Sequence, residues 1–336
     1  MNEVKSSILY SFFKNIDECK VIPYGSGLIH QTFYLHQPEG NYILQKVNHH
    51  VFKNPIDLAN NIEVVSNHLK QNHYPKSVLN IRKCLNGNLM LQTTKNEYWR
   101  VFDFIEDTQY FSKPESKKQI YQTGKSFGEF LAFLKNLPIK KINPSIPNFH
   151  NTRLRFQNFE KAIQNDKSNR VKTSSQEIEQ IKKWHFILKD FEKLDTPIRV
   201  VHADPKISNL LFDHNKKVKA VIDWDTIMPG FLLHDFGDLV RTGACEEDEE
   251  STNFGKIKIS PSYYGILKKG FLESTKLWLT KVEEDNLLLG TKIIIYEQAI
   301  RFLTDYLEGD QYYKTSYTNQ NINRTKNQIE LLNSIL

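Results

Sequence analysis

The fold of this chain is decided by one short stretch, His202-Ala203-Asp204-Pro205-Lys206-Ile207-Ser208-Asn209. An apolar run leads into it at 198–201 and another leads out at 210–212, so we expect two core strands to hold the loop between them. A third apolar run, at 218–222, ends at Asp223, 14 residues beyond Asn209. A hairpin between the second and third runs would return Asp223 to the side of Asn209.

The polar side chains of this stretch suit phosphoryl transfer from a nucleotide to a hydroxyl group. In the spacing His-x-Asp-x-x-x-x-Asn, the aspartate accepts the hydroxyl proton, and the asparagine and a later aspartate hold magnesium. Asp204 is therefore the predicted general base, and Asn209 and Asp223 are the predicted Mg²⁺ ligands, because Mg²⁺ prefers hard oxygen atoms. Lys206 is a candidate catalytic residue that either stabilises the transferring phosphoryl group or is simply solvated.

Neighbouring residues are open to more than one role. His202 is expected to brace the loop by hydrogen bonding and not to act as a base. Asp225 lies two residues beyond Asp223, so it would point to the same side of an extended strand and could bind metal or a substrate hydroxyl. The triplet Asp235-Phe236-Gly237 spells the kinase metal motif but lies too far along the chain. We expect Asp235 to cap a helix and brace the loop.

The order of predicted elements indicates two lobes. In the first part we expect three strands, a helix that begins at Asn54-Pro55, and two strands joined at Asn86-Gly87. Helical spacing of apolar residues follows at 117–137, 174–194, 263–278 and 283–307. This predicts an α+β, bilobal, protein-kinase-like fold. Residues 1–105 would form the β-rich nucleotide-binding lobe, and residues 106–336 the mostly helical catalytic and substrate-binding lobe.

A nucleotide site is predicted in the first lobe. The loop from Tyr24 to His30 lies between two strands, and its residues Gly25, Ser26 and Gly27 would let the backbone approach phosphate oxygens. A phosphate-pairing lysine is expected on the third strand, where Gln45 and Lys46 face opposite sides and either could face the nucleotide. Adenine would lie against the connector near Phe104.

Composition excludes several other classes of protein. The net charge is +6, but Lys and Arg are scattered, and no basic stripe with interleaved aromatics indicates a nucleic-acid partner. The three cysteines are far apart, which fits a reducing compartment and a cytoplasmic location. The apolar stretch 287–307 carries Lys292, Glu297 and Arg301, so we expect a buried helix and no membrane span.

Two further segments have simple expected structures. Gly124-Lys125-Ser126 lacks the earlier glycine of a phosphate-binding P-loop and lies within a predicted helix. The acidic run Glu246 to Glu250 is expected to be a solvated loop.

The segment 202–209 together with Ile222-Asp223-Trp224-Asp225 resembles the aminoglycoside phosphotransferase-like kinases. A longer match resembles one branch of them, the N-acetylhexosamine 1-kinases. That match rests on the segments 24–30, 42–48, 220–230, 235–241 and 301–310. The chain departs from the branch pattern at His30, Ala203, Pro205 and Trp224. These departures leave the chemistry intact and the exact sugar open.

The resemblance implies a function in carbohydrate metabolism: ATP- and Mg²⁺-dependent phosphorylation of the anomeric hydroxyl of GlcNAc or GalNAc. It places Asp225, Arg301 and Tyr312 around the sugar. Two alternatives stay open: a kinase of the same fold for another sugar, an amino alcohol or an aminoglycoside, and a catalytically silent nucleotide-binding protein. The lack of an unambiguous phosphate-pairing lysine on the third strand favours the silent protein, whereas the presence of Asp204, Asn209 and Asp223 favours an enzyme.

Overall fold

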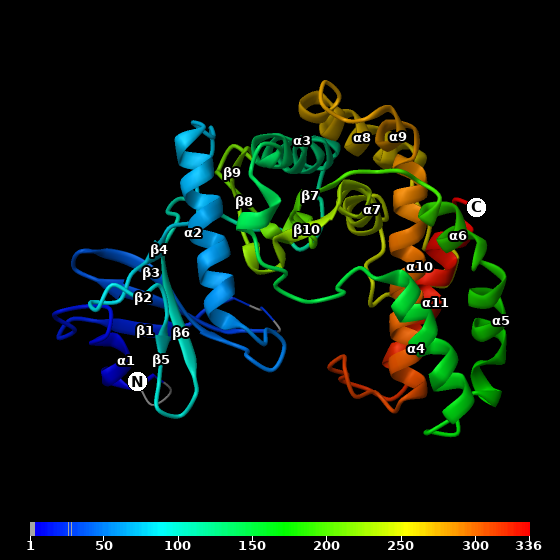
Figure 1. Cartoon of the computed structure of the whole chain (residues 1–336), viewed down its shortest axis with the longest axis horizontal. Coiled ribbons are helices and arrows are strands. Elements are labelled where there is room, and N and C mark those ends of the chain that lie inside the picture. The colour runs from blue at the N-terminus through cyan, green and yellow to red at the C-terminus, as the bar shows by residue number, and fades with distance from the viewer. Residues whose placement is uncertain (1–3, 26, 28) are drawn as a thin grey trace.

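The N-terminal part of the computed structural model is an antiparallel sheet, and helices dominate the rest, so the predicted α+β class is confirmed (Figure 1). Residues 4–25, 27 and 29–336 are described. The N-terminal elements are α1 (Ser6–Leu9), β1 (Lys20–Pro23), β2 (Gln31–Gln37), β3 (Gly40–Val47), α2 (Pro55–Gln71), β4 (Ile81–Arg82), β5 (Leu91–Gln92) and β6 (Tyr98–Asp103).

The sheet has the strand order β1-β2-β3-β6-β4, with β5 also paired to β6. Strand alternation gives it two different faces. Leu44 and Trp99 lie on one face and pack against Phe12 and Phe13 in a small separate core. On the other face, Ile43 and Val47 are part of the main core or pack against it. That core also includes buried residues of α2 and of the helical part, so α2 joins the two parts of the molecule.

The remaining chain contains the helices and two short two-stranded sheets, β7 with β10 and β8 with β9. Its elements are α3 (Lys117–Leu134), α4 (Thr152–Asn165), α5 (Ser175–Lys183), α6 (Phe186–Glu192), β7 (Ile198–Val201), β8 (Leu210–Phe212), β9 (Val218–Val221), β10 (Met228–Phe231), α7 (Leu232–Gly243), α8 (Pro261–Thr275), α9 (Lys281–Asp285), α10 (Leu287–Leu307) and α11 (Gln320–Asn333). Short 3₁₀ turns are η1 (Ile139–Lys141), η2 (Lys172–Ser174), η3 (Ile207–Asn209), η4 (Trp224–Thr226) and η5 (Phe254–Lys256).

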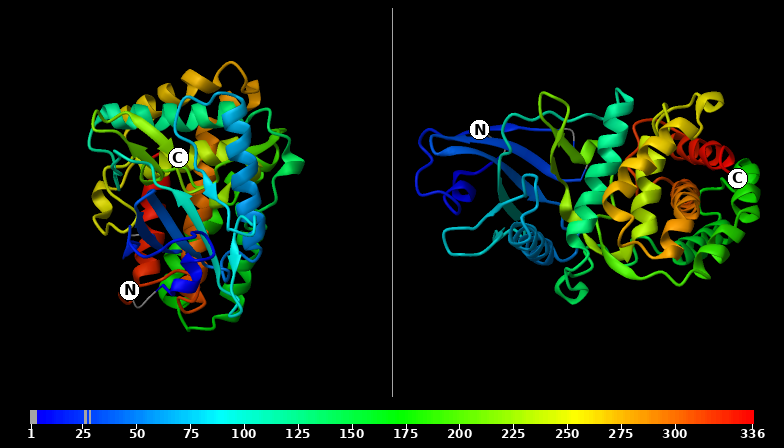
Figure 2. Two further views of the ribbon diagram at one scale, coloured as in Figure 1. Left: turned by 90° about the vertical axis from the view of Figure 1, so that its left-hand side faces the viewer. Right: turned by 90° about the horizontal axis from the view of Figure 1, so that it is seen from above.

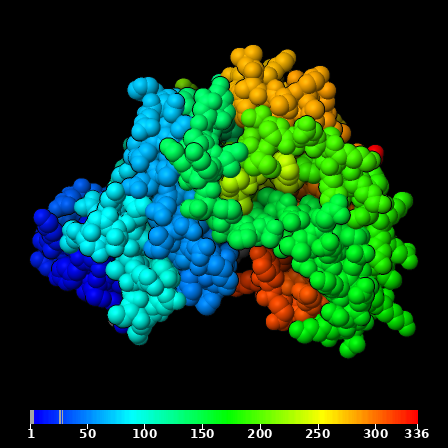
Figure 3. Space-filling model, viewed as in Figure 1, coloured from blue at the N-terminus to red at the C-terminus, as the bar shows by residue number. Residues whose placement is uncertain are grey.

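The long helix α10 lies at the centre of the helical part, with α4, α6, α7 and α11 packed around it (Figure 2). In the space-filling view, the surface is notched between the N-terminal part and the orange-red segment after α10 (Figure 3). Among the residues that the structure describes, no helix combines the length and hydropathy needed to span a bilayer.

The helix expected at 174–194 is broken in two, so that prediction is wrong in detail. The backbone leaves the helical region at Trp184, between α5 and α6. Trp184, Ile181 and Ile187 are all buried in the main core, and the break lets both short helices turn apolar side chains toward α10. Ser174 and Glu177 have the sequence spacing of a capping box, but no such box forms, because the Ser174 hydroxyl donates to the Arg170 carbonyl instead.

Helices α3 and α8 meet at glycines, and this contact explains Gly124. A Cβ atom built at Gly124 would lie 2.3 Å from the Leu267 carbonyl oxygen, and one built at Gly270 would lie 2.3 Å from the Tyr121 carbonyl oxygen. Small residues let the two helix backbones approach closely. The segment 124–126 is therefore a helix-packing surface within α3 and not a phosphate-binding loop, as expected from the sequence.

Gly270→Ala is expected to destabilise the protein by about 1–3 kcal/mol, because overpacking forces backbone shifts. Gly265→Ala on the same helix is the control. Its Cβ atom would meet nothing within 4 Å, so it should stabilise α8 by up to about 1 kcal/mol. Urea unfolding of both variants measures the difference. Equal stabilities would contradict the close contact between α3 and α8.

Candidate active site

The predicted base and metal ligands come together on the loops that join β7, β8 and β9. The Asn209 side-chain amide donates to the Asp204 backbone carbonyl (2.9 Å) and lies 3.3 Å from its carboxylate Oδ2. The hairpin of β8 and β9 returns the chain as expected, and the Ile222 amide donates to the Asn209 carbonyl at 2.9 Å. Asp223 follows directly, so three oxygen-bearing side chains converge at one place.

The loop that carries Asp204 is held by buried hydrogen bonds. The Asp235 carboxylate accepts the backbone N–H groups of His202 (2.8 Å) and Ala203 (2.9 Å). His202 donates from Nε2 to the Ile222 carbonyl at 3.0 Å, and burial lowers its pKa to about 4. A neutral His202 is therefore a brace between the two loops, and Asp235 has the bracing role expected of it.

Lys206 lies beside the base. Its Nζ atom is 2.8 Å from Asp204 Oδ2. Burial opposes its positive charge, but the neighbouring Asp204 raises the pKa of Lys206 above its usual value, so the side chain stays protonated. The sequence left two roles open for Lys206, phosphoryl stabilisation or simple solvation. An unpaired, solvated side chain does not match this ion pair with Asp204.

The surroundings of Asp223 favour a cation. Burial among protein atoms raises the pKa of Asp223, and the charges of Asp225 and Asp204 raise it further. A divalent ion would relieve this repulsion. No group of three or more His, Cys, Asp or Glu side chains in the described ranges could hold a metal ion. Asn209 and Asp223 supply two oxygen ligands, which suits an ion that takes its other ligands from water and phosphates.

Asp225 does not lie where its spacing from Asp223 suggested. The backbone of Asp223 is left-handed (φ 61°, ψ 60°), and the chain then enters η4, so the strand does not continue and Asp225 faces the N-terminal part. Its carboxylate oxygens accept from Arg100 Nη1 and Nη2, both at 2.5 Å. His30 Nε2 adds a third contact at 2.8 Å. Asp225 is 3% exposed, so the structure gives it a buried ion pair in place of the expected substrate contact.

Gln45 and Lys46 lie on opposite faces of the sheet, as strand alternation predicted. Gln45 lies on the same face as Arg100, and its side-chain oxygen accepts from Arg100 Nε at 3.0 Å. Lys46 lies on the opposite face, 2.6 Å from Glu97 and over the Trp99 ring. Lys46 therefore lies on the face away from the helical part, and Arg100 from β6 is a cation on the inner face that Gln45 shares.

The other predicted nucleotide residues lie near the edge of the sheet. Gly25 has φ 76°, a conformation that favours glycine, and a Cβ atom at Gly27 would meet nothing within 4 Å. Ser26 lies outside the described residues. The Phe104 ring packs against Tyr34 (5.1 Å between centroids) and Tyr24 (5.9 Å), which forms an aromatic cluster beside the glycine loop.

A cavity of about 50 Å³, open to solvent, lies beside the base. It brings Asp204 and Arg301 together, as the sequence suggested. Tyr312 does not line the cavity, and it is 62% exposed. Its backbone N–H donates to the Asp305 carboxylate at 2.7 Å. The residues that line the cavity are Phe149, His150, Ala203, Asp204, Asp238, Arg241, Ile294, Glu297, Gln298 and Arg301.

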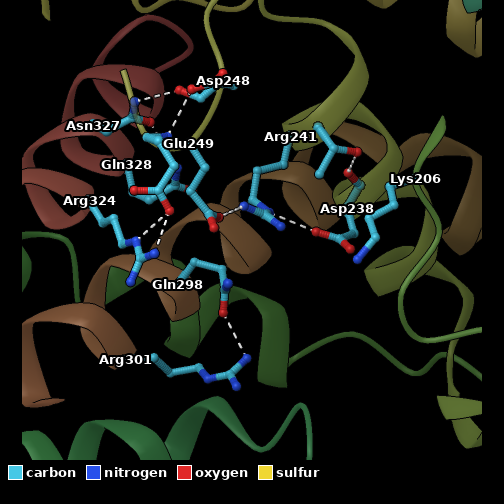
Figure 4. A network of polar contacts seen from close by, with 12 residues as sticks. Lys206, Asp238, Arg241, Asp248, Glu249, Gln298, Arg301, Arg324, Asn327 and Gln328 are labelled. Carbon is cyan, nitrogen blue, oxygen red and sulfur yellow. Dashed lines mark hydrogen bonds and ion pairs between the residues drawn. The ribbon is translucent and has the colours of Figure 1, made fainter. Parts of the chain in front are cut away.

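Several of these residues were missed by sequence reasoning. Arg241 lies between Asp238 (2.7 Å) and Glu249, as Figure 4 shows. Arg301 donates to Gln298 at 2.7 Å (Figure 4). Glu297, buried within the apolar α10, contacts His150 at 2.9 Å. The sequence did contain one signal for this contact: Glu297 lies in a largely apolar segment, and a buried charge requires a partner.

The acidic run 246–250 is not simply a solvated loop, so that expectation is corrected. Glu249 forms an ion pair with Arg241 (Figure 4), and Glu250 forms one with Arg324 of α11. Arg241 is 8 residues from Glu249, whereas Arg324 is 74 residues from Glu250, and only the packing of α11 brings Arg324 to the loop.

Residues 20–256 match the model of the APH phosphotransferase enzyme family, and this match covers more than half of the chain. This chain belongs to the phosphotransferase enzyme family. Its Asp204, Asn209 and Asp223 all lie within the matched residues.

Solved structures of other phosphotransferases share the fold of this chain. An aminoglycoside phosphotransferase from Alicyclobacillus acidocaldarius is 11% identical, with a TM-score of 0.66 over 99% of this chain and 95% of that one. ADP-bound aminoglycoside phosphotransferase APH(2'')-Ib is 14% identical, with a TM-score of 0.59 over 99% and 100%. A microcompartment-associated aminopropanol kinase is 11% identical, with a TM-score of 0.58 over 97% and 95%. These similarities confirm the predicted protein-kinase-like fold.

Proposed function

We propose that this phosphotransferase is an ATP- and Mg²⁺-dependent kinase that phosphorylates the anomeric hydroxyl of an N-acetylhexosamine, GlcNAc or GalNAc. The observation that carries the proposal is the position of Asp204 in the wall of a cavity whose charges are balanced. A base at this place can take the proton of a hydroxyl group held in the cavity.

The charges around the cavity favour a neutral acceptor. Asp238 is paired with Arg241, and Glu297 is paired with His150, so these carboxylates are already neutralised. A polycationic aminoglycoside would need unpaired carboxylates, and a quaternary amine would need a cage of aromatic rings. Among the described lining residues, Phe149 is the one Phe, Tyr or Trp. A polyhydroxyl compound with hydrogen-bonding oxygens fits this lining better than a cation.

The chemistry follows from the positions of the side chains. Asp204 accepts the acceptor hydroxyl's proton as its oxygen attacks the γ-phosphorus of ATP, the bond from that phosphorus to the bridging oxygen breaks, and ADP leaves. Lys206 offsets negative charge beside the base. Asn209 and Asp223 would hold Mg²⁺, which supplies positive charge to the phosphates when it is bound. Arg301 and Tyr312 would contact the sugar. We infer no direct substrate contact for Asp225.

The nucleotide is proposed to bind between the sheet and the loops of the catalytic segment. Its phosphates would lie against Gly25, Ser26 and Gly27, with Gln45 on the inner face and adenine near Phe104. We thus assign residues 1–105 to nucleotide binding and residues 106–336 to catalysis and acceptor binding. The ADP in the APH(2'')-Ib structure supports ATP as the donor. Three free, buried cysteines and the need for ATP support a cytoplasmic location.

An acceptor panel tests the proposal. ATP consumption with Mg²⁺ would be measured with GlcNAc, GalNAc, glucose, choline, aminopropanol and an aminoglycoside. We expect the highest kcat/KM with one of the two N-acetylhexosamines and a product that is the 1-phosphate by NMR. Faster turnover of an amino alcohol or aminoglycoside would contradict the neutral acceptor, and no turnover with any compound would contradict the enzyme.

A further inference from the structure

His150 connects the catalytic loop to the buried glutamate of α10. It lies in the segment before α4, and its ring lines the cavity beside Asp204. Nε2 is 3.0 Å from the Ala203 carbonyl oxygen, and Nδ1 is 2.9 Å from Glu297 Oε1. The Thr152 hydroxyl donates to the other oxygen of Glu297 at 2.6 Å and fixes that carboxylate.

The two partners of His150 determine its protonation. A backbone carbonyl can only accept a hydrogen bond, and an ionised carboxylate can only accept as well. Burial disfavours charge on Glu297, yet His150 lowers the pKa of Glu297 to about 2. Both ring nitrogens must therefore carry hydrogen for both contacts to be hydrogen bonds, so His150 is an imidazolium.

The charged groups around the ring agree with this protonation. Burial opposes the charge on His150, but Glu297 of α10 and, more weakly, Asp238 of α7 leave its pKa raised. His234 of α7 lies 5.3 Å away, between ring centroids. Burial, together with the charge of His150, lowers the pKa of His234 to about 3, so that neighbour stays neutral.

The peptide that His150 holds is the one before the base. Ala203 has φ 64°, a left-handed conformation that costs a non-glycine residue roughly 1–2 kcal/mol. Its N–H is held by Asp235 at 2.9 Å, and its carbonyl is held by His150 at 3.0 Å. Both ends of Ala203 are thus fixed by buried charged groups, and Asp204 follows immediately.

We propose that His150, as an imidazolium paired with Glu297, is a positioning residue that fixes the Ala203–Asp204 peptide and thereby aims the base at the acceptor. The inference rests on the proposed role of Asp204 as the base. His150 takes no proton from the acceptor. Its contribution is the hydrogen bond to Ala203, and Glu297 keeps the ring in the form that can donate it.

The kinetic test compares His150→Gln with His214→Gln, which changes an exposed histidine in the turn between β8 and β9. We expect His150→Gln to lower kcat by roughly 10- to 100-fold, since a misplacement of about 1 Å has effects of this size. KM for ATP should stay within about twofold, because the nucleotide site is not touched. A kcat equal to that of the His214 variant in a folded protein would overturn the proposal.

Histidine ¹⁵N NMR of the wild-type protein gives a test that does not depend on the acceptor or on a variant that folds. At about pH 8, one histidine should still have both ring nitrogens protonated, although free imidazole is then neutral. That signal should vanish in His150→Gln. It should also vanish in Glu297→Gln, whose amide can donate to Nδ1 of a neutral ring.

The outcomes of these tests separate the two proposals. Absence of a doubly protonated histidine in the wild type, or its persistence in Glu297→Gln, would overturn the role of His150 whatever the acceptor. If no acceptor in the panel increased ATP consumption, the proposed function would be overturned. The NMR experiment would still show whether both ring nitrogens of His150 are protonated. In that case, the rate of phosphoryl transfer from ATP to water would be compared between His150→Gln and His214→Gln.

Discussion

Replacing Asp204 by Asn is expected to lower kcat by about 10²–10⁴-fold, the usual contribution of a general base. Asparagine keeps the size of the side chain and can still accept hydrogen bonds from Lys206 and Asn209, which lie 2.8 and 3.3 Å from Asp204 Oδ2. It cannot take the acceptor's proton at neutral pH. The loop is held through His202 and Ala203, so its backbone should not change.

Steady-state kinetics with the preferred acceptor measures this effect, and calorimetry with ATP and Mg²⁺ checks that nucleotide still binds. Asp190→Asn is the control, because Asp190 is exposed and contacts Lys193 on the protein surface. It should leave kcat unchanged. Near-normal turnover in Asp204→Asn would show that the acceptor proton goes elsewhere, and the assignment of the base would be lost.

Replacing Arg100 by Met is expected to destabilise the protein by about 3–5 kcal/mol, as when one partner of a buried ion pair is removed. Arg100 is 2% exposed and makes two contacts of 2.5 Å to Asp225. Methionine fills much of the same space but leaves the carboxylate of Asp225 with its contact to His30 at 2.8 Å in place of the guanidinium. The cost is mainly that of an uncompensated charge in the interior.

Urea unfolding measures this effect, and Lys46→Met is the matched control on the neighbouring strand. Lys46 and Glu97 are 31% and 30% exposed, so breaking their ion pair should cost at most about 1 kcal/mol. A double variant, Arg100→Met with Asp225→Leu, should lose less stability than Arg100→Met alone, because no unpaired charge remains. Equal losses in Arg100→Met and Lys46→Met would contradict a buried pair between the two parts of the molecule.

The ion pair of Arg100 also shows where prediction from sequence stopped. Strand alternation correctly put Gln45 and Lys46 on opposite faces of one strand. It could not say which face the helical part covers, because that depends on contacts with residues far along the chain, among them Asp225. The predicted orientation of Asp225 was wrong for a local reason. The strand was assumed to continue past Asp223, whereas the backbone turns left-handed there.

The sequence alone determined the catalytic segment, since its apolar runs and turn residues are local signals that predict two strands, a loop and a hairpin. It determined the order of the elements and hence the fold class for the same reason. The tertiary structure alone decided the walls of the acceptor cavity. His150 and Glu297, which both line it, are 147 residues apart in the chain. Buried charges find their partners through packing, and packing leaves no local pattern in the sequence.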